Sequence, residues 1–454
     1  MSFHFVHAGD ASSSRRKAAR SHVMKGKNAG KVIASRGKKA ATKHQLAELI
    51  PAHDGTIASI RRLAGSDLST FSPGAELTPH IRLLLSQYFN IVGEALYPSE
   101  LCEPSNVLKM AWFEYMINDK AFFHVSLAVT AATLDFYEHA DADSPQCVYH
   151  TTQAIRHVNK RLTGCEKLSD TTIGVVCMLT IQESVRSDLE KYQTHMRGLY
   201  SMVDLRGGIR AFDANDELQQ KIYRTDIQYA LQVNCRPRYF SRCVPETVGQ
   251  RLASVRDTTP RNLSINFEGA PEEVLQLVKD VEQASFLFNN IGRDSKLSPE
   301  EYKSIMTSLC YRLKHAEAAH QEHLNANQKV CLVGLVCLMT TLLLQFGRQR
   351  RVKYTALAVS LKQSLCDIGV GTQLPLSSYF WLLMIGGISV FDIEDEGWLL
   401  PGITRCNQIM GLKDWTQARS LLQSLPWIHV FHTLPGKELW LKTTREVTVL
   451  NEEI

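Results

Sequence analysis

The sequence predicts an all-α fold, a large irregular helical bundle that follows a disordered basic N-terminal tail. Apolar residues recur at spacings of three and four along most of the chain, and few segments alternate with period two. Hydrophobic residues make up 44% of the 454 positions, which is enough for a large core. This length allows two or three average domains or one large helical body.

The chain divides into two regions by composition. Residues 1–70 are predicted to be a disordered basic tail and linker, because no Phe, Tyr or Trp lies between Val6 and Thr70. Such a segment buries too little apolar surface to offset the entropy lost on ordering. Residues 71–454 are predicted to form an all-helical domain, with a candidate sub-boundary at 237–265 around a loop from Pro237 to Pro260.

Seven helices are expected before that loop. Tyr192, Met196, Leu199 and Val203 illustrate the pattern, since their spacing places them on one helix face. That helix is expected to end at Gly207 and Gly208, where glycine adopts the left-handed conformation at no steric cost. The seven predicted helices are 78–94, 105–118, 121–139, 145–162, 170–187, 189–206 and 214–234.

Helix starts are easiest to recognise in the second half of the chain. Pro271 and Pro299 are each expected at the first position of a helix, followed by two glutamates in the first turn. Ser298 and Glu301 have the spacing of a capping box. Asp414 with Gln417 repeats that spacing. The predicted helices are 271–290, 299–324, 328–347, 353–367, 376–391 and 414–424.

The run from Val330 to Phe346 is the strongest candidate for a membrane span. It has seventeen residues and is interrupted by Gly334, Thr340, Thr341 and Gln345, so it is short of the ~20 apolar residues that cross a bilayer. We predict a helix buried on all sides and no contact with a membrane.

The sequence predicts no catalytic residues, no metal and no cofactor. It contains no Gly-x-Ser-x-Gly elbow, Walker loop, Rossmann glycine fingerprint or His-Glu-x-x-His motif. His315, His320 and His323 lack an evident third ligand, so we interpret them as a solvated polar face. The eleven cysteines form no Cys-x-x-Cys pair, and we expect buried free thiols, with Cys331 and Cys337 packed in the core.

The N-terminal tail has the strongest functional signal. The first forty-four residues hold eleven Lys and Arg against one acid, Asp10, whereas the remaining 410 hold forty against forty-five. Short basic clusters of this kind bind import receptors or phosphates. A mitochondrial presequence and a merely solubilising extension are the alternatives. The predicted contact residues are Arg15, Arg16, Lys17, Arg20, Lys25, Lys27, Arg36, Lys38 and Lys39.

One segment resembles a known family. HMRGLYSMVDLRGGI (195–209), preceded by DTTIGVVCMLTIQE (170–183), resembles the core of the fungal-specific transcription factor domain found behind zinc-cluster DNA-binding modules. FFH (122–124), WLL (381–383) and WTQARSLLQSLPW (415–427) support the resemblance. The motif residues are predicted to serve structure: His195, Met196, Arg197, Gly198, Leu199, Arg206, Gly207 and Gly208.

The sequence departs from this family at its DNA-binding module. A Zn2Cys6 cluster needs six closely spaced cysteines, and the first cysteine here is Cys102, inside the predicted helical body. The resemblance therefore implies the regulatory and interaction half of a transcription regulator, located in the nucleus and not an enzyme. The expected partners are a nuclear import receptor and transcription-related proteins. Weak, non-specific contact with DNA and formation of a homodimer are also expected. A cytoplasmic or organellar helical scaffold or ligand-binding protein is the alternative.

Overall fold

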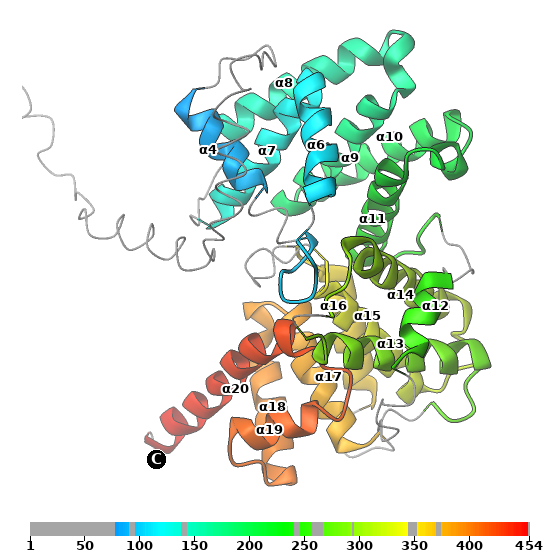
Figure 1. The fold of residues 1–454 in the computed structure, drawn as a ribbon. Helices are drawn as coiled ribbons and strands as arrows, with labels where there is room; N and C mark the ends of the chain where they lie inside the picture. The colour runs from blue at the N-terminus through cyan, green and yellow to red at the C-terminus, as the bar shows by residue number, and fades with distance from the viewer. Residues whose placement is uncertain are drawn as a thin grey trace, which may run out of the picture. The chain divides into compact units, whose positions relative to one another are not determined.

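The computed structural model describes residues 78–89, 96–104, 106–137, 143–239, 246–255, 267–292, 295–343, 352–368 and 374–452. Over these ranges the chain is all-α, as predicted, with no strand and one isolated bridge between Cys102 and Leu297 (Figure 1). The predicted tail, residues 1–70, lies outside the described residues.

The first group of helices surrounds α7 and α9. Helix α7 packs against α4, α6, α8 and α9, and α9 also packs against α10 and α11. Nearly every side chain of α9 from Thr172 to Val185 is buried, because the helix is covered on all faces. The bounds are α4 (Pro79–Gln87), α6 (Asn106–Asn118), α7 (Lys120–Tyr137), α8 (Pro145–Leu162), α9 (Asp170–Arg186), α10 (Leu189–Leu205) and α11 (Asp216–Gln232).

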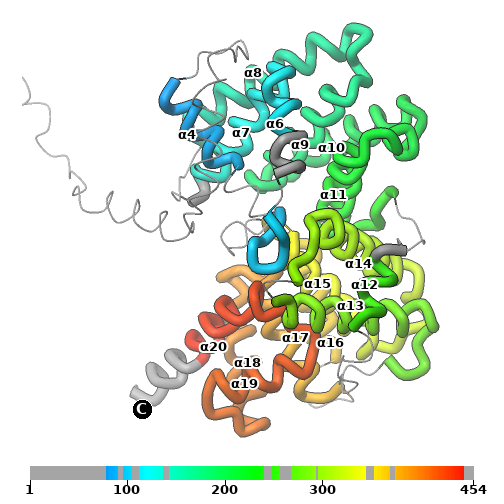
Figure 2. The backbone as a smooth tube through the Cα atoms, in the orientation of Figure 1, coloured from blue at the N-terminus to red at the C-terminus, as the bar shows by residue number. Residues whose placement is uncertain are grey.

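The remaining helices form a second core around α15 and α17 (Figure 2). Helix α11 contacts this group through α14 and α16. The bounds are α12 (Glu246–Ala253), α13 (Glu272–Asn289), α14 (Pro299–Ala319), α15 (Ala326–Thr340), α16 (Thr355–Ile368), α17 (Leu376–Ser389), α18 (Glu396–Met410), α19 (Trp415–Leu422) and α20 (His429–Glu452).

Helix α15 contains the first part of the candidate membrane segment and is buried from Val330 to Thr340. It packs against α14, α16 and α17. Among the described residues, no helix combines the length and hydropathy of a membrane span. The prediction of a buried core helix is therefore confirmed from Val330 to Thr340, whereas Leu342 and Leu343 are buried beyond the end of the helix.

Helix α20 is held against α15 by His432, which is completely buried. The backbone N–H of Ile428 donates to His432 Nδ1 at 2.9 Å, and Nε2 lies 2.8 Å from Thr341 Oγ1. Burial lowers the pKa of His432 to about 3. The imidazole is therefore neutral, with its proton on Nε2, and donates to the hydroxyl.

Three helices were missed by the sequence prediction. Helix α12 lies within the predicted loop 237–260, where Val248 and Leu252, one turn apart, bury themselves in the second core. Helices α18 and α20 contain Pro401 and Pro435 in their interiors. A proline within a helical pattern normally marks the end of a helix, so neither segment has the sequence pattern of one continuous helix.

Helix starts agree with the predicted capping. Ser298 Oγ accepts from the Glu301 N–H at 3.1 Å and the Glu301 carboxylate accepts from the Ser298 N–H at 2.8 Å, which completes the predicted capping box. Asp414 caps α19 by accepting from the Gln417 N–H at 2.9 Å. Pro271 precedes α13 as its N-cap residue, one position earlier than predicted.

Candidate functional site

The end of α10 forms the turn that its two glycines predicted. Gly207 and Gly208 have φ values of 109° and 86°, in the region that favours glycine. The Gly208 N–H donates to the Val203 carbonyl at 2.9 Å and the Gly207 N–H to the Asp204 carbonyl at 3.0 Å. This pair of bonds is a Schellman motif, which satisfies the last carbonyls of the helix and reverses the chain.

Arg206, directly before the glycines, ties the end of α10 to the start of α9. Its Nη1 donates to the Leu168 carbonyl at 2.6 Å, and its Nη2 pairs with Asp170 Oδ1 at 2.5 Å. The guanidinium also lies 4.9 Å from the ring centroid of Phe212. Asp170 accepts in addition from Asn215, the N-cap residue of α11. Arg206 thus connects three helix termini.

We expect Arg206→Ala to lower the free energy of unfolding by about 1–2 kcal/mol, since the pair is partly exposed and one hydrogen bond to a carbonyl is lost with it. Urea unfolding followed by circular dichroism measures this loss. Arg206→Lys keeps the charge but not the fork, and we expect it to recover part of the loss. Loss of partner binding with unchanged unfolding would contradict a structural role.

The other motif residues lie at different depths on α10. Met196 and Leu199 are buried in the first core, His195 is half-buried, and Arg197 and Gly198 are exposed. Burial and the neighbouring charge of Lys191 lower the pKa of His195. Of these residues only the half-buried and exposed ones are accessible to a partner.

A buried carboxylate joins α10, α11 and α14. Asp226 on α11 is completely buried. Its oxygens accept from Tyr200 Oη and Tyr311 Oη, both at 2.6 Å, and from the backbone N–H groups of Arg238, at 3.1 Å, and Tyr239, at 3.0 Å. Burial and the adjacent carboxylate raise the pKa of both phenols. The hydroxyls therefore remain protonated and act as donors.

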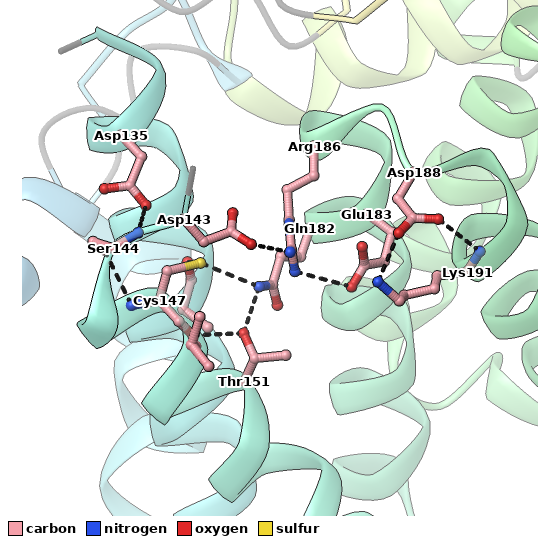
Figure 3. A network of polar contacts seen from close by, with 12 residues as sticks. Asp135, Asp143, Ser144, Cys147, Thr151, Gln182, Glu183, Arg186, Asp188 and Lys191 are labelled. Atoms are coloured by element: carbon pink, nitrogen blue, oxygen red, sulfur yellow. Dashed lines mark hydrogen bonds and ion pairs between the residues drawn. The ribbon is translucent and has the colours of Figure 1, made fainter. Parts of the chain in front are cut away.

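A second polar network connects α7, α8 and α9 and includes the end of the segment 170–183 (Figure 3). Gln182 Nε2 donates to Thr151 Oγ1 at 2.6 Å, and Arg186 pairs with Asp143 and, at 3.5 Å, with Glu183. Burial raises the pKa of Glu183 against the opposing charge of Arg186. This network fixes the register of the three helices.

Asp135, Asp143 and Cys147 in that network have ligand atoms within 4.8 Å of one another, as a metal site would need. Each is already engaged. Asp135 accepts from the Ser144 N–H at 2.9 Å, Asp143 pairs with Arg186, and the Cys147 thiol donates to the Ala128 carbonyl at 3.8 Å. Burial raises the pKa of Cys147 to about 11, which disfavours the thiolate that binds metals. The arrangement is explained by helix packing.

The three histidines His315, His320 and His323 are only partly the solvated face that the sequence predicted, and only His315 lies within α14. His315 is buried, with its Nδ1 3.2 Å from Arg236 Nη2, so that part of the prediction is wrong. His323 is exposed and His320 lies 3.4 Å from Glu273. The side chain of His315 turns inward because α14 packs on several sides.

The free thiols of the described cysteines are mostly buried, and Cys331 and Cys337 are among the buried ones. Cys165, Cys235 and Cys366 are exposed.

The predicted contact residues of the tail, Arg15 to Lys39, all lie outside the described residues. Sequence reasoning did not single out Asp226. The available signal was a carboxylate one turn from Ile222 and one turn from Ala230 on an apolar helix face. A buried carboxylate on such a face requires donors from elsewhere in the fold.

Comparison with protein families gives a match over most of the chain. The family model described as "Fungal specific transcription factor domain" matches residues 82–423, which is well over half of the chain. No curated protein and no solved structure matches this chain. The matched range begins in α4 and ends one residue after α19. It includes the α10 turn, the Asp226 cluster, the first core and the second core apart from its contributions beyond residue 423, such as those of α20. The chain belongs to the family of proteins that carry the fungal-specific transcription factor domain.

Proposed function

We propose that this chain is a nuclear transcription regulator or co-regulator that acts through contacts of its helical domain. The family match is the observation that carries this proposal. The helical domain supplies the regulatory and partner-binding surface, and no catalytic role is expected of it. Transcription-related proteins and a second copy of the chain are the proposed partners of this surface.

The basic tail is proposed to deliver the domain to the nucleus and to make weak phosphate contacts. Three clusters support this: Arg15 to Arg20, Lys25 with Lys27, and Arg36 with Lys38 and Lys39. Because no Phe, Tyr or Trp lies between Val6 and Thr70, base stacking is not available, and DNA contact would involve backbone phosphates. Such contact weakens steeply with salt.

Replacing Arg15, Arg16, Lys17 and Arg20 together with Ala is expected to move a fluorescent fusion of the full chain from nucleus to cytoplasm, because an import receptor loses its cationic contacts. Live-cell imaging measures the nuclear fraction. A matched control removes four exposed cations from the helical domain and should leave the distribution unchanged. Its positions are Arg156, Lys160, Lys167 and Lys329.

An unchanged distribution of the tail variant would remove the localisation argument, and mitochondrial accumulation of the intact protein would favour a presequence. Chromatin immunoprecipitation of the full chain against a variant lacking residues 1–44 separates a regulator from a cytoplasmic or organellar scaffold. No enrichment at any promoter with the intact protein would favour the scaffold.

A further inference from the structure

A small cavity lies beside α11, where α6, α9 and α14 also line it. Its volume is about 50 Å³. Trp112 and Ile181 form its apolar walls, and α11 presents Glu217, Lys221 and Arg224 along one face. Lys303 reaches it from α14. Three cationic side chains therefore meet around a space that could hold roughly four water-sized groups.

Arg224 has an unused hydrogen-bonding edge. Its Nε and Nη2 are both buried, and in the described part of the chain neither finds a hydrogen-bond acceptor. These two nitrogens form the side of the guanidinium that binds both oxygens of a carboxylate or phosphate at once. Leaving such donors buried and unpaired is costly, because water is lost and nothing replaces it.

Lys303, on α14, likewise has a buried nitrogen without a hydrogen-bond acceptor among the described residues. Its side chain is only 6% exposed, and its Nζ makes no hydrogen bond to any described residue. The nearest carboxylate oxygens belong to Asp216, at 3.5 Å, and Glu217, at 4.0 Å, both longer than a charge-assisted hydrogen bond. Asp216 is 62% exposed, so water screens its charge.

Lys221 completes the cationic set. Its ammonium lies 3.9 Å from the centroid of the Trp112 ring, a cation–π contact that holds it at the cavity wall. Burial, together with the positive charge of Arg224, lowers the pKa of Lys221 to about 8 despite the opposing charge of Glu217. The cavity lining therefore has three basic groups against one carboxylate, Glu217, whose own pKa is raised by burial.

We propose that this cavity binds a small oxyanion, a phosphate or carboxylate group, held by the side edge of Arg224 and by the ammonium groups of Lys303 and Lys221. An oxyanion supplies the acceptors that Arg224 and Lys303 lack and balances the excess positive charge. The cavity size limits the ligand to an inorganic ion or to one anionic group of a larger molecule that enters from the protein surface. Binding would bridge α11 and α14.

The test measures thermal unfolding of the full chain at constant ionic strength, with inorganic phosphate or acetate titrated against chloride. The wild type is expected to show a saturable rise in Tm, since a ligand that binds only the folded state stabilises it. Arg224→Lys keeps the charge but removes the fork, and Lys303→Met removes a charge at similar length. Each should weaken the apparent affinity roughly tenfold to a hundredfold, as expected for a lost charge-assisted hydrogen bond.

Lys329→Met is the matched control, because Lys329 is exposed on α15, outside the cavity lining. It should respond as the wild type does. A response to phosphate alone assigns a phosphate group, and a response to both probes assigns oxyanions generally. The proposal fails if the wild type shows no saturable rise with either probe, or if all variants bind equally. Should Lys303→Met not fold, Arg224→Lys alone decides. None of these outcomes depends on nuclear localisation.

Discussion

Asp226→Ala is expected to lower the free energy of unfolding by about 3–5 kcal/mol, because four donors lose their shared acceptor inside the protein. The phenol of Tyr200 and the N–H groups of Arg238 and Tyr239 would be left unpaired. The phenol of Tyr311 would keep only its bond to the Tyr223 carbonyl, at 3.0 Å. The substitution also leaves a cavity where α10, α11 and α14 meet. Urea unfolding followed by circular dichroism measures the change.

Variants that remove one tyrosine hydroxyl each provide a scale for the effect of Asp226→Ala. Tyr200→Phe and Tyr311→Phe each remove one donor and keep the ring, so we expect losses of about 1–2 kcal/mol. Asp226→Asn keeps an acceptor oxygen and should fall between these values and that of Asp226→Ala. If Asp226→Ala unfolded within about 1 kcal/mol of the wild type, the carboxylate would not organise the three helices.

Gly334→Ala is expected to destabilise the second core by about 1–3 kcal/mol, the usual cost of overpacking. A Cβ at Gly334 would lie 2.3 Å from Leu382 Cδ2 and 2.8 Å from an atom of the Trp381 ring. Trp381 cannot retreat easily, because it is completely buried and its Nε1 donates to the Pro426 carbonyl at 2.8 Å. The same urea unfolding experiment tests this change.

Gly198→Ala is the matched control for that substitution. Gly198 lies within α10, and a Cβ there would meet nothing within 4 Å. Because alanine loses less backbone entropy in a helix, we expect a gain of about 0.5–1 kcal/mol. Equal effects at the two positions would show that helix propensity, and not close helix packing, determines the response at Gly334.

Local signals in the sequence predicted most of the helices. The Ser298 and Glu301 capping box and the turn at Gly207 and Gly208 involve residues within one or two turns, so their spacing identifies them. Helices α18 and α20 were missed because Pro401 and Pro435 suggested breaks. Each proline removes a single backbone donor, and the packing of Trp440 and of His432 outweighs that loss in α20.

The buried polar groups were harder to predict. Asp226 receives its donors from Tyr200, 26 positions earlier, and from Tyr311, 85 positions later. Arg224 and Lys303 likewise meet only because α11 packs against α14. Sequence spacing carries information about neighbours on one helix, and it does not show which polar residues of different helices come together.

The burial of α15 from Val330 to Thr340 has a consequence for protein fragments. Its aliphatic surface is covered by α14, α16 and α17, and α17 ends only at Ser389. A polypeptide that stops before Leu376 would lack α17, and the part of this surface that α17 covers would be exposed and prone to aggregation. The same exposure arises transiently during synthesis, until the ribosome has released the segment that forms α17. Truncations intended for partner mapping should therefore preserve the chain from α14 through α20.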